Sequence, residues 1–210
     1  DVTVEDFFEW AIESGPFGTS TPEITDVHFV DDLEPYIERK LFTVNTGHAT
    51  LAYHGHLHGA TTLSAAMAID AIAMEVDAVL AETSTMLIAK HGFDAVSHAE
   101  YVSNCIGRFR NPYLPDTPER VGRSPLRKLS RNERFISPAA ERAQSGTRPS
   151  ALLRAVGAAL RFDVPEDPES VQMLELLSSL SPEEFVNRVL GLRDGEALYA
   201  QAVETVSGRA

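Results

Sequence analysis

Apolar residues recur at helical spacing along most of this chain, and that periodicity limits the possible folds more than any other feature. Residues 34–56 follow a helical pattern, and residues 63–90 are apolar over most of the helical circumference. Gly92 follows the second pattern, and glycine is common at the ends of helices. We therefore expect residues 63–90 to form a long central helix.

Helical patterns continue to the C-terminus, joined by short polar segments. Ser181, Pro182 and Glu184 give a strong start signal: an N-cap hydroxyl, a proline in the first turn and a carboxylate three residues on. The further helices that we expect cover residues 93–109, 117–129, 137–144, 150–162, 168–180, 181–192 and 195–206.

Strand signals are rare. Residues 24–30 have the composition of a short strand, whereas residues 4–11 read as an amphipathic helix with Trp10 beside its apolar side. The fold class that we expect is mostly α: one multi-helical domain over residues 1–210, with at most one or two short strands near residues 24–30. No strand leads into a Gly-x-Gly-x-x-Gly loop, so we expect any nucleotide-binding half to lie upstream in a longer protein. The apolar side of the first helix would hold Val4, Phe7, Phe8 and Ala11.

Composition narrows the class of partner. The net charge of −13 and a pI near 4.9 mean that the surface as a whole repels nucleic acid. No apolar run approaches the roughly 18 residues that a membrane span needs. The single cysteine, Cys105, excludes an internal disulfide and a cysteine-based zinc site. We expect a cytoplasmic protein with no nucleic-acid or membrane partner, and Cys105 buried in a helix.

Three polar side chains of different chemistry interrupt the helical pattern of residues 34–56. At about 100° per residue, Lys40, Asn45 and His48 fall at roughly 0°, 140° and 80°, so they could line one pocket. An amine, an amide and an imidazole are the groups that a carbonyl/alcohol redox site needs. The alternative that spacing leaves open is a surface lysine, a capping asparagine and a buried, hydrogen-bonded histidine.

A basic cluster occupies residues 120–134, which carry six of the chain's 18 lysines and arginines against one acid, Glu133. Guanidinium groups bind phosphate through paired hydrogen bonds, so a small phosphorylated ligand is the partner that fits best. The alternative is that these bases pair with Glu119, Glu133 and other surface acids. The six bases are Arg120, Arg123, Arg127, Lys128, Arg131 and Arg134.

Three histidines, His54, His56 and His58, invite a metal interpretation because two of them stand four residues apart. Gly55 and Gly59 weaken the helix there, and no carboxylate stands nearby. We therefore expect no metal site, and we expect these histidines to be solvated at a polar helix end.

Two segments carry a family resemblance, which covers nearly the whole chain and is strongest at residues 38–53 and 106–130. They are ERKLFTVNTGHATLAYHG and GRFRNPYLPDTPERVGRSPLRKLS. Together they resemble the C-terminal domain of the mannitol-1-phosphate 5-dehydrogenases, a branch of the polyol-specific long-chain dehydrogenases. The family signature is a lysine, then an asparagine five residues later and a histidine three later, and Lys40, Asn45 and His48 match it. The three neighbouring histidines are not part of that pattern.

The resemblance implies a fold like the C-terminal domain of 6-phosphogluconate dehydrogenase, and a missing N-terminal Rossmann domain that binds NAD. It implies a monomeric, metal-independent enzyme that interconverts mannitol 1-phosphate and fructose 6-phosphate by hydride transfer. Lys40 would be the general base, Asn45 would donate a hydrogen bond to the reacting oxygen, and His48 would orient the substrate. The residues that would bind the phosphate are Arg120, Arg123, Arg127 and Lys128.

Two other functions remain open from the sequence. A mannitol 2-dehydrogenase or a hexuronate reductase would share the chemistry but would have no use for a phosphate site. A noncatalytic helical ligand-binding or interaction domain would leave Lys40 merely exposed.

Overall fold

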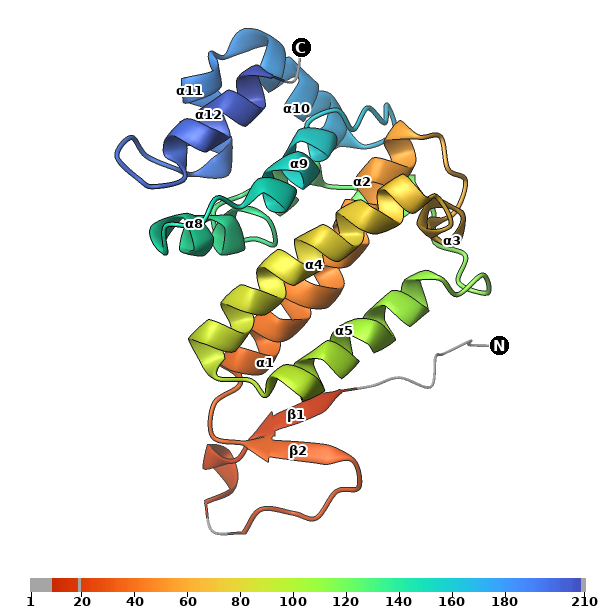
Figure 1. The fold of residues 1–210 in the computed structure, drawn as a ribbon, viewed down its shortest axis with the longest axis vertical. Coiled ribbons are helices and arrows are strands. Elements are labelled where there is room, and N and C mark those ends of the chain that lie inside the picture. Colours follow the sequence, from red (N-terminus) through yellow and green to blue (C-terminus); the bar gives the residue numbers. More distant parts are fainter. Residues whose placement is uncertain (1–8, 19, 209–210) are drawn as a thin grey trace.

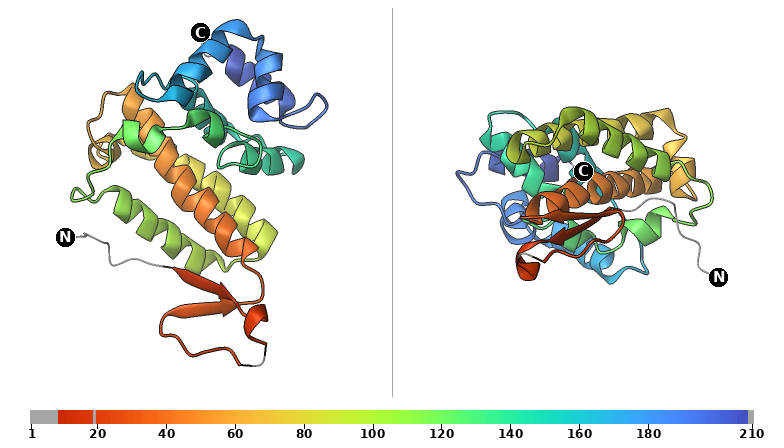
Figure 2. Two further views of the ribbon diagram at one scale, coloured as in Figure 1. Left: turned by 180° about the vertical axis from the view of Figure 1, so that it is seen from behind. Right: turned by 90° about the horizontal axis from the view of Figure 1, so that it is seen from below.

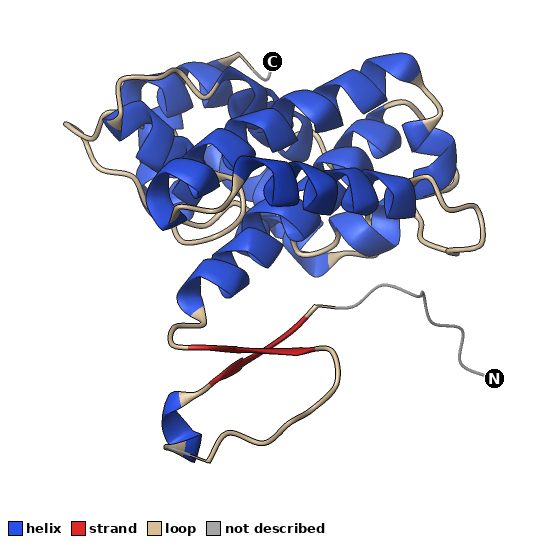
Figure 3. Ribbon diagram, turned by 60° about the horizontal axis from the view of Figure 1, so that its bottom comes forward, coloured by secondary structure: helices blue, strands red, loops and turns tan. Residues whose placement is uncertain are grey.

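The computed structural model describes residues 9–18 and 20–208, and Figure 1 shows a mostly helical body with a small sheet at one end. The sheet consists of β1 (Trp10–Glu13) and β2 (Val27–Val30), which run parallel with Trp10 opposite Val27. It lies beside the helical body in Figure 3. The mostly α fold class and the strand expected near residues 24–30 are both confirmed.

The helix expected over residues 4–11 is wrong where the structure describes it. Trp10 and Ala11 belong to β1, while Val4, Phe7 and Phe8 lie outside the described residues. A four-residue strand has too few residues to show a period. Its pairing with β2, which stabilises it, is an interaction between distant parts of the chain.

The helices follow one another with short connections. Residues 34–57 form α1 (Glu34–Arg39), a π-helical turn (Lys40–Asn45) and α2 (Thr46–Leu57) without interruption. The next group is α3 (Leu63–Met67), α4 (Asp70–His91), α5 (Ala95–Phe109), α6 (Pro118–Gly122), α7 (Pro125–Lys128) and α8 (Ile136–Gln144). The last group is α9 (Ser150–Ala159), α10 (Pro168–Ser179), α11 (Pro182–Phe185), a second π-helical turn (Val186–Leu190) and α12 (Tyr199–Ser207).

The long central helix expected over residues 63–90 is broken into α3 and α4. Ile69 adopts an extended backbone conformation between them, which lets α3 pack on α2 through Ala66 while α4 takes its own direction along α2. The end at Gly92 is confirmed, because this residue adopts the left-handed conformation (φ 68°) that closes α4.

A larger share of α2 than of α4 is buried. Ala49 and Tyr53 belong to the core that α8 to α12 cover, whereas Leu51 and Ala52 belong to the core shared with α3, α4 and α5. Figure 2 shows α2 running alongside α4. A helix buried on both sides has no polar face, which explains why its sequence lacks a clear amphipathic pattern. The candidate site residues lie in its first turn and in the π-helical turn that precedes it.

No helix among the described residues is long and apolar enough to cross a bilayer.

Candidate functional site

A π-helical turn carries the first two candidate residues. Lys40 and Asn45 are its first and last residues, and His48 follows in the first turn of α2. A π-helical turn holds an extra residue, which rotates the following side chains back by about 100° relative to a regular helix. This rotation brings Lys40 and His48 closer to one line along the helix. π-helical turns occur often at functional sites.

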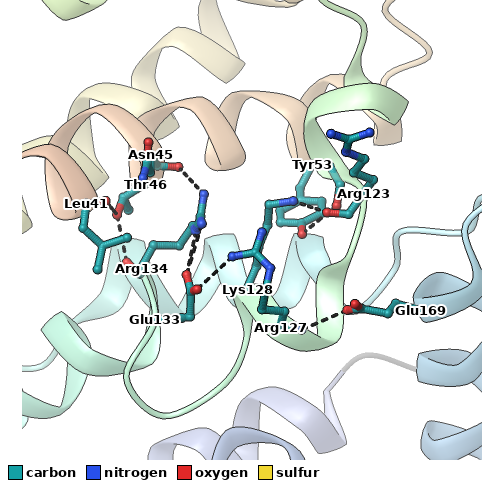
Figure 4. A network of polar contacts seen from close by, with 11 residues as sticks. Leu41, Asn45, Thr46, Tyr53, Arg123, Arg127, Lys128, Glu133, Arg134 and Glu169 are labelled. Carbon is teal, nitrogen blue, oxygen red and sulfur yellow. Dashed lines mark hydrogen bonds and ion pairs between the residues drawn. The ribbon is translucent and has the colours of Figure 1, made fainter.

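The buried hydroxyl of Thr46 fixes this turn. Its Oγ1 lies 3.0 Å from the carbonyl oxygen of Leu41 and 2.9 Å from that of Arg134, so it bridges the turn to the segment before α8 (Figure 4). The backbone that bears Lys40 and Asn45 is therefore held from two sides.

Lys40 and His48 open onto two adjacent cavities. His48 lines a cavity of about 170 Å³ together with Asp116. Lys40, an exposed side chain, lines a cavity of about 460 Å³. Val44 and Arg108 line both cavities, so the two are neighbours on one face of the domain. Ala11 of β1 forms part of the wall beside Lys40.

His48 is held in a largely buried position. Its ring stacks on Phe109, and its Nε2 lies 3.6 Å from Oδ2 of Asp116. Burial lowers the pKa of His48, the Asp116 carboxylate opposes that shift, and Arg108 and Arg120 reinforce it. The neutral imidazole, which both donates and accepts a hydrogen bond, is thereby favoured near neutral pH.

Asn45 lines neither of these two cavities. Its backbone carbonyl oxygen accepts a long hydrogen bond, 3.4 Å, from Nη1 of Arg134. Arg134 also contacts Oε2 of Glu133 at 3.1 Å, and Figure 4 shows its guanidinium beside Asn45. The structure therefore does not bring all three residues to one pocket. Lys40 and His48 line two adjacent cavities, and Asn45 lies next to Arg134.

The basic cluster does not form one patch. Arg120 forms an ion pair with Asp116, the residue that faces His48. Arg127 instead pairs with Glu133, 2.8 Å away, and Arg131 pairs with Glu196. Much of the cluster therefore takes part in ion pairs with acids, as the alternative interpretation expected.

Glu119, the other acid expected to pair with these bases, lies beside His56 instead, with 3.5 Å between Oε1 of Glu119 and Nδ1 of His56.

Lys128 is a buried lysine. Its Nζ donates a hydrogen bond to the carbonyl oxygen of Arg123, whose side chain is exposed (Figure 4). Burial, with smaller contributions from Arg134 and Arg127, lowers the pKa of Lys128 to about 8. The four phosphate-binding candidates are thus divided. Arg120 pairs with Asp116, which lines the His48 cavity, whereas Arg123, Arg127 and Lys128 lie in or next to α7.

The three neighbouring histidines are less solvated than expected. His58 is exposed, but His54 and His56 are partly buried. The Nε2 of His54 is buried without a hydrogen-bond partner among the described residues, and burial lowers its pKa. The ring of His56 packs against Phe162, with centroids 4.8 Å apart. Within the described part of the chain, no group of three or more His, Cys, Asp or Glu side chains could hold a metal ion.

Arg108 and Asp116 are site residues that the sequence analysis missed. Both lie within the segment that carries the family resemblance, but neither stands at a regular spacing from Lys40 or His48. The one feature of the sequence that could have indicated them is that they are charged residues within that segment.

Comparison with known proteins places this geometry in context. A family model described as the mannitol dehydrogenase C-terminal domain matches residues 32–206. Two relatives named mannitol-1-phosphate 5-dehydrogenase, from Arthrobacter sp. (strain FB24) and Aspergillus terreus, are 54% and 49% identical to this chain. The matches cover 98% and 99% of this chain but 53% and 54% of those relatives, so the chain spans about half their length.

Among solved structures, the mannitol 2-dehydrogenase of Pseudomonas fluorescens, in a ternary complex with NAD and D-mannitol, has a similar fold. The TM-score is 0.71 at 20% sequence identity, over 88% of this chain and 39% of that chain.

Proposed function

Because the chain belongs to the mannitol dehydrogenase C-terminal domain family, we propose that it forms the substrate-binding half of a mannitol-1-phosphate 5-dehydrogenase. The observation that carries this proposal is the 54% identity, over 98% of the chain, to a relative of that name. Lys40 and His48, which open onto adjacent cavities, supply groups suited to the reaction. We extend the proposal to a monomeric, cytoplasmic enzyme that acts on a small phosphorylated sugar.

NAD would be held mainly by the N-terminal half that the relatives possess in addition. The described residues contain no strand followed by a glycine-rich phosphate-binding loop, the element that a dinucleotide requires. When bound, NAD+ supplies the hydride acceptor.

In the direction of oxidation, Lys40 takes the proton of the C5 hydroxyl of mannitol 1-phosphate as hydride leaves the same carbon. C5 becomes the carbonyl carbon, which is C2 of fructose 6-phosphate, and the step uses no metal ion. Lys40 must be a neutral amine to accept the proton.

Asn45 and His48 would act on the substrate's oxygens. The Asn45 amide donates a hydrogen bond to the oxygen on which negative charge develops, which stabilises the transition state. It must turn toward the Lys40 side to do so, since it lines neither cavity here. His48 orients a substrate hydroxyl from its position against Phe109.

The phosphate would be bound by Arg120, Arg123, Arg127 and Lys128. Arg120 is the member nearest the His48 cavity, because its partner Asp116 lines that cavity. Its side chain is 62% exposed, so a phosphate could reach it without displacing buried groups.

The test compares fructose 6-phosphate with fructose as substrates of the full-length protein, with NADH as the reductant. We expect kcat/KM to favour the phosphorylated sugar by at least about 100-fold, because fructose lacks the charge-assisted hydrogen bonds that a phosphate makes with these bases. Equal rates would remove the phosphate assignment and favour a mannitol 2-dehydrogenase or hexuronate reductase. No turnover of either sugar, nor of hexuronates, would favour a noncatalytic domain.

A further inference from the structure

Asp116 stands between two residues that the proposed reaction uses. Its Oδ2 lies 3.6 Å from Nε2 of His48, and its Oδ1 forms an ion pair with the guanidinium of Arg120. The carboxylate is largely buried, with 14% of the side chain exposed. Its backbone carbonyl accepts a hydrogen bond of 2.9 Å from the amide of Leu63 at the start of α3. The backbone at Asp116 is therefore anchored to the start of α3.

We propose that Asp116 is a positioning residue that holds His48 and Arg120 toward the same cavity. The inference rests on the proposed function for the reaction that it serves, but the contacts themselves do not depend on the identity of the substrate.

The His48 ring is fixed on two sides. Phe109 packs flat against one face of the ring and sets its plane. Asp116 then acts on the Nε2 edge. At 3.6 Å the contact is Coulombic rather than a full hydrogen bond. An anion at this edge favours the tautomer that carries its proton on Nε2, which leaves Nδ1 as the acceptor for a substrate hydroxyl.

Arg120 gains a direction from the same carboxylate. A long exposed arginine samples many rotamers, and holding it in one of them costs conformational entropy. The ion pair at Oδ1 restricts Arg120 to fewer rotamers before the substrate binds, so less entropy is lost on binding. The cation is then held next to Asp116, which lines the cavity together with His48.

The charges around His48 make the arrangement measurable. Arg108 at the end of α5, Arg120 in α6 and Arg134 before α8 all lower the pKa of His48, and burial lowers it most. Asp116 is the anion that opposes them. Substitutions at Asp116 and Arg120 should therefore move the titration of His48 in opposite directions.

The experiment follows the titration of the His48 ring by NMR in the full-length enzyme, with the His48→Gln variant to assign the signal. Asp116→Asn should lower the pKa of His48, because the imidazolium loses its anion. Arg120→Gln should raise it, since a cation is removed and Asp116 is released toward His48. Asp116→Glu keeps the charge and should stay closer to the wild-type value than Asp116→Asn.

Glu119→Gln is the matched control. It also removes one negative charge near α6, but Glu119 contacts His56 rather than His48, so the pKa of His48 should not move. The exposed position of Arg120 makes Arg120→Gln a sound second test should Asp116→Asn fail to fold. A pKa of His48 that stays at the wild-type value in either folded variant would overturn the proposal.

Kinetics then separate positioning from folding. Asp116→Asn should lower kcat/KM for mannitol 1-phosphate about tenfold or more. The acid limb of the plot of kcat/KM against pH should move to lower pH together with the pKa of His48. A purely structural defect would lower the rate without moving that limb, which would contradict a positioning role. If wild-type enzyme does not turn over mannitol 1-phosphate, the proposed function fails, while the NMR titration still tests the arrangement.

Discussion

The imidazole of His48 lies flat on the phenyl ring of Phe109, with centroids 5.3 Å apart and ring planes within 7° of each other. Gly47 makes this approach possible. A Cβ atom built on Gly47 would lie 2.9 Å from Cε2 of Phe109 and 3.2 Å from Cδ2 of Leu80. The residue before His48 thus determines where the ring beneath His48 can sit.

Replacing Gly47 with alanine should therefore disturb both packing and catalysis. Overpacking costs about 1–3 kcal/mol, and the gain in helix propensity returns about 0.5–1 kcal/mol. We expect a net loss of about 1–2 kcal/mol in the free energy of unfolding, measured by urea denaturation. A lower kcat/KM should accompany it because Phe109 must move.

Gly107→Ala, in the helix that carries Phe109, is the control. A Cβ there would meet no atom within 4 Å, so this variant should be about 0.5–1 kcal/mol more stable than wild type. Equal gains for both variants would mean that Phe109 yields freely and does not fix His48.

Thr46→Val should loosen the π-helical turn. The substitution keeps the shape of the side chain but removes the hydroxyl that contacts Leu41 and Arg134, leaving buried carbonyls without that donor. We expect a loss of about 1–3 kcal/mol in the free energy of unfolding.

Thr85→Val provides the comparison, because the Thr85 hydroxyl also bonds a helix carbonyl, that of Ala81, but at an exposed site. It should change stability by less than about 0.5 kcal/mol. If both threonines cost the same, the buried bridge has no special role.

Lys128 should give the enzyme a pH-dependent affinity for phosphorylated substrate. With a pKa lowered to about 8, the amine is charged below that pH and loses its charge above it. The KM for fructose 6-phosphate should therefore rise between about pH 7 and pH 9, because the phosphate stays doubly charged over this range. Lys128→Arg should abolish the rise, since guanidinium stays charged. A wild-type KM that is flat across this range would contradict a contact between Lys128 and the phosphate.

Local signals predicted most of the helical framework. The start at Ser181 is confirmed as a full capping box with Glu184, and Cys105 is buried in α5 as expected. These features depend on residues close together in the chain, which is why periodicity and capping residues sufficed. The family was also identified correctly, because its signature at Lys40, Asn45 and His48 has a fixed spacing.

Features that depend on distant contacts were missed. β1 exists through its pairing with β2, and α2 proved more buried than α4 because cores form on both of its sides. Alanine-rich stretches such as that of α4 fit equally well inside or outside, and Met74 in α4 is 71% exposed. Sequence could not predict this, since burial is decided by which helices meet.

The candidate site shows the same division. Spacing indicated that Lys40 and His48 lie close together, but a regular helix was assumed, so the π-helical turn and the separate position of Asn45 were not foreseen. Asp116 joins the site through tertiary folding alone. The basic residues were expected to form one patch because they lie close together in sequence. In the structure they pair with different acids.

Turnover of mannitol 1-phosphate with NAD+ by full-length Lys40→Ala enzyme tests most directly the claim that Lys40 is the general base. A positioned general base contributes roughly 100- to 10,000-fold, so kcat should fall by at least about 100-fold. Lys90→Ala is the control. Lys90 of α4 pairs with Glu38 of α1 and Glu141 of α8, so this variant should keep wild-type kcat. Near wild-type turnover by folded Lys40→Ala enzyme would contradict the claim.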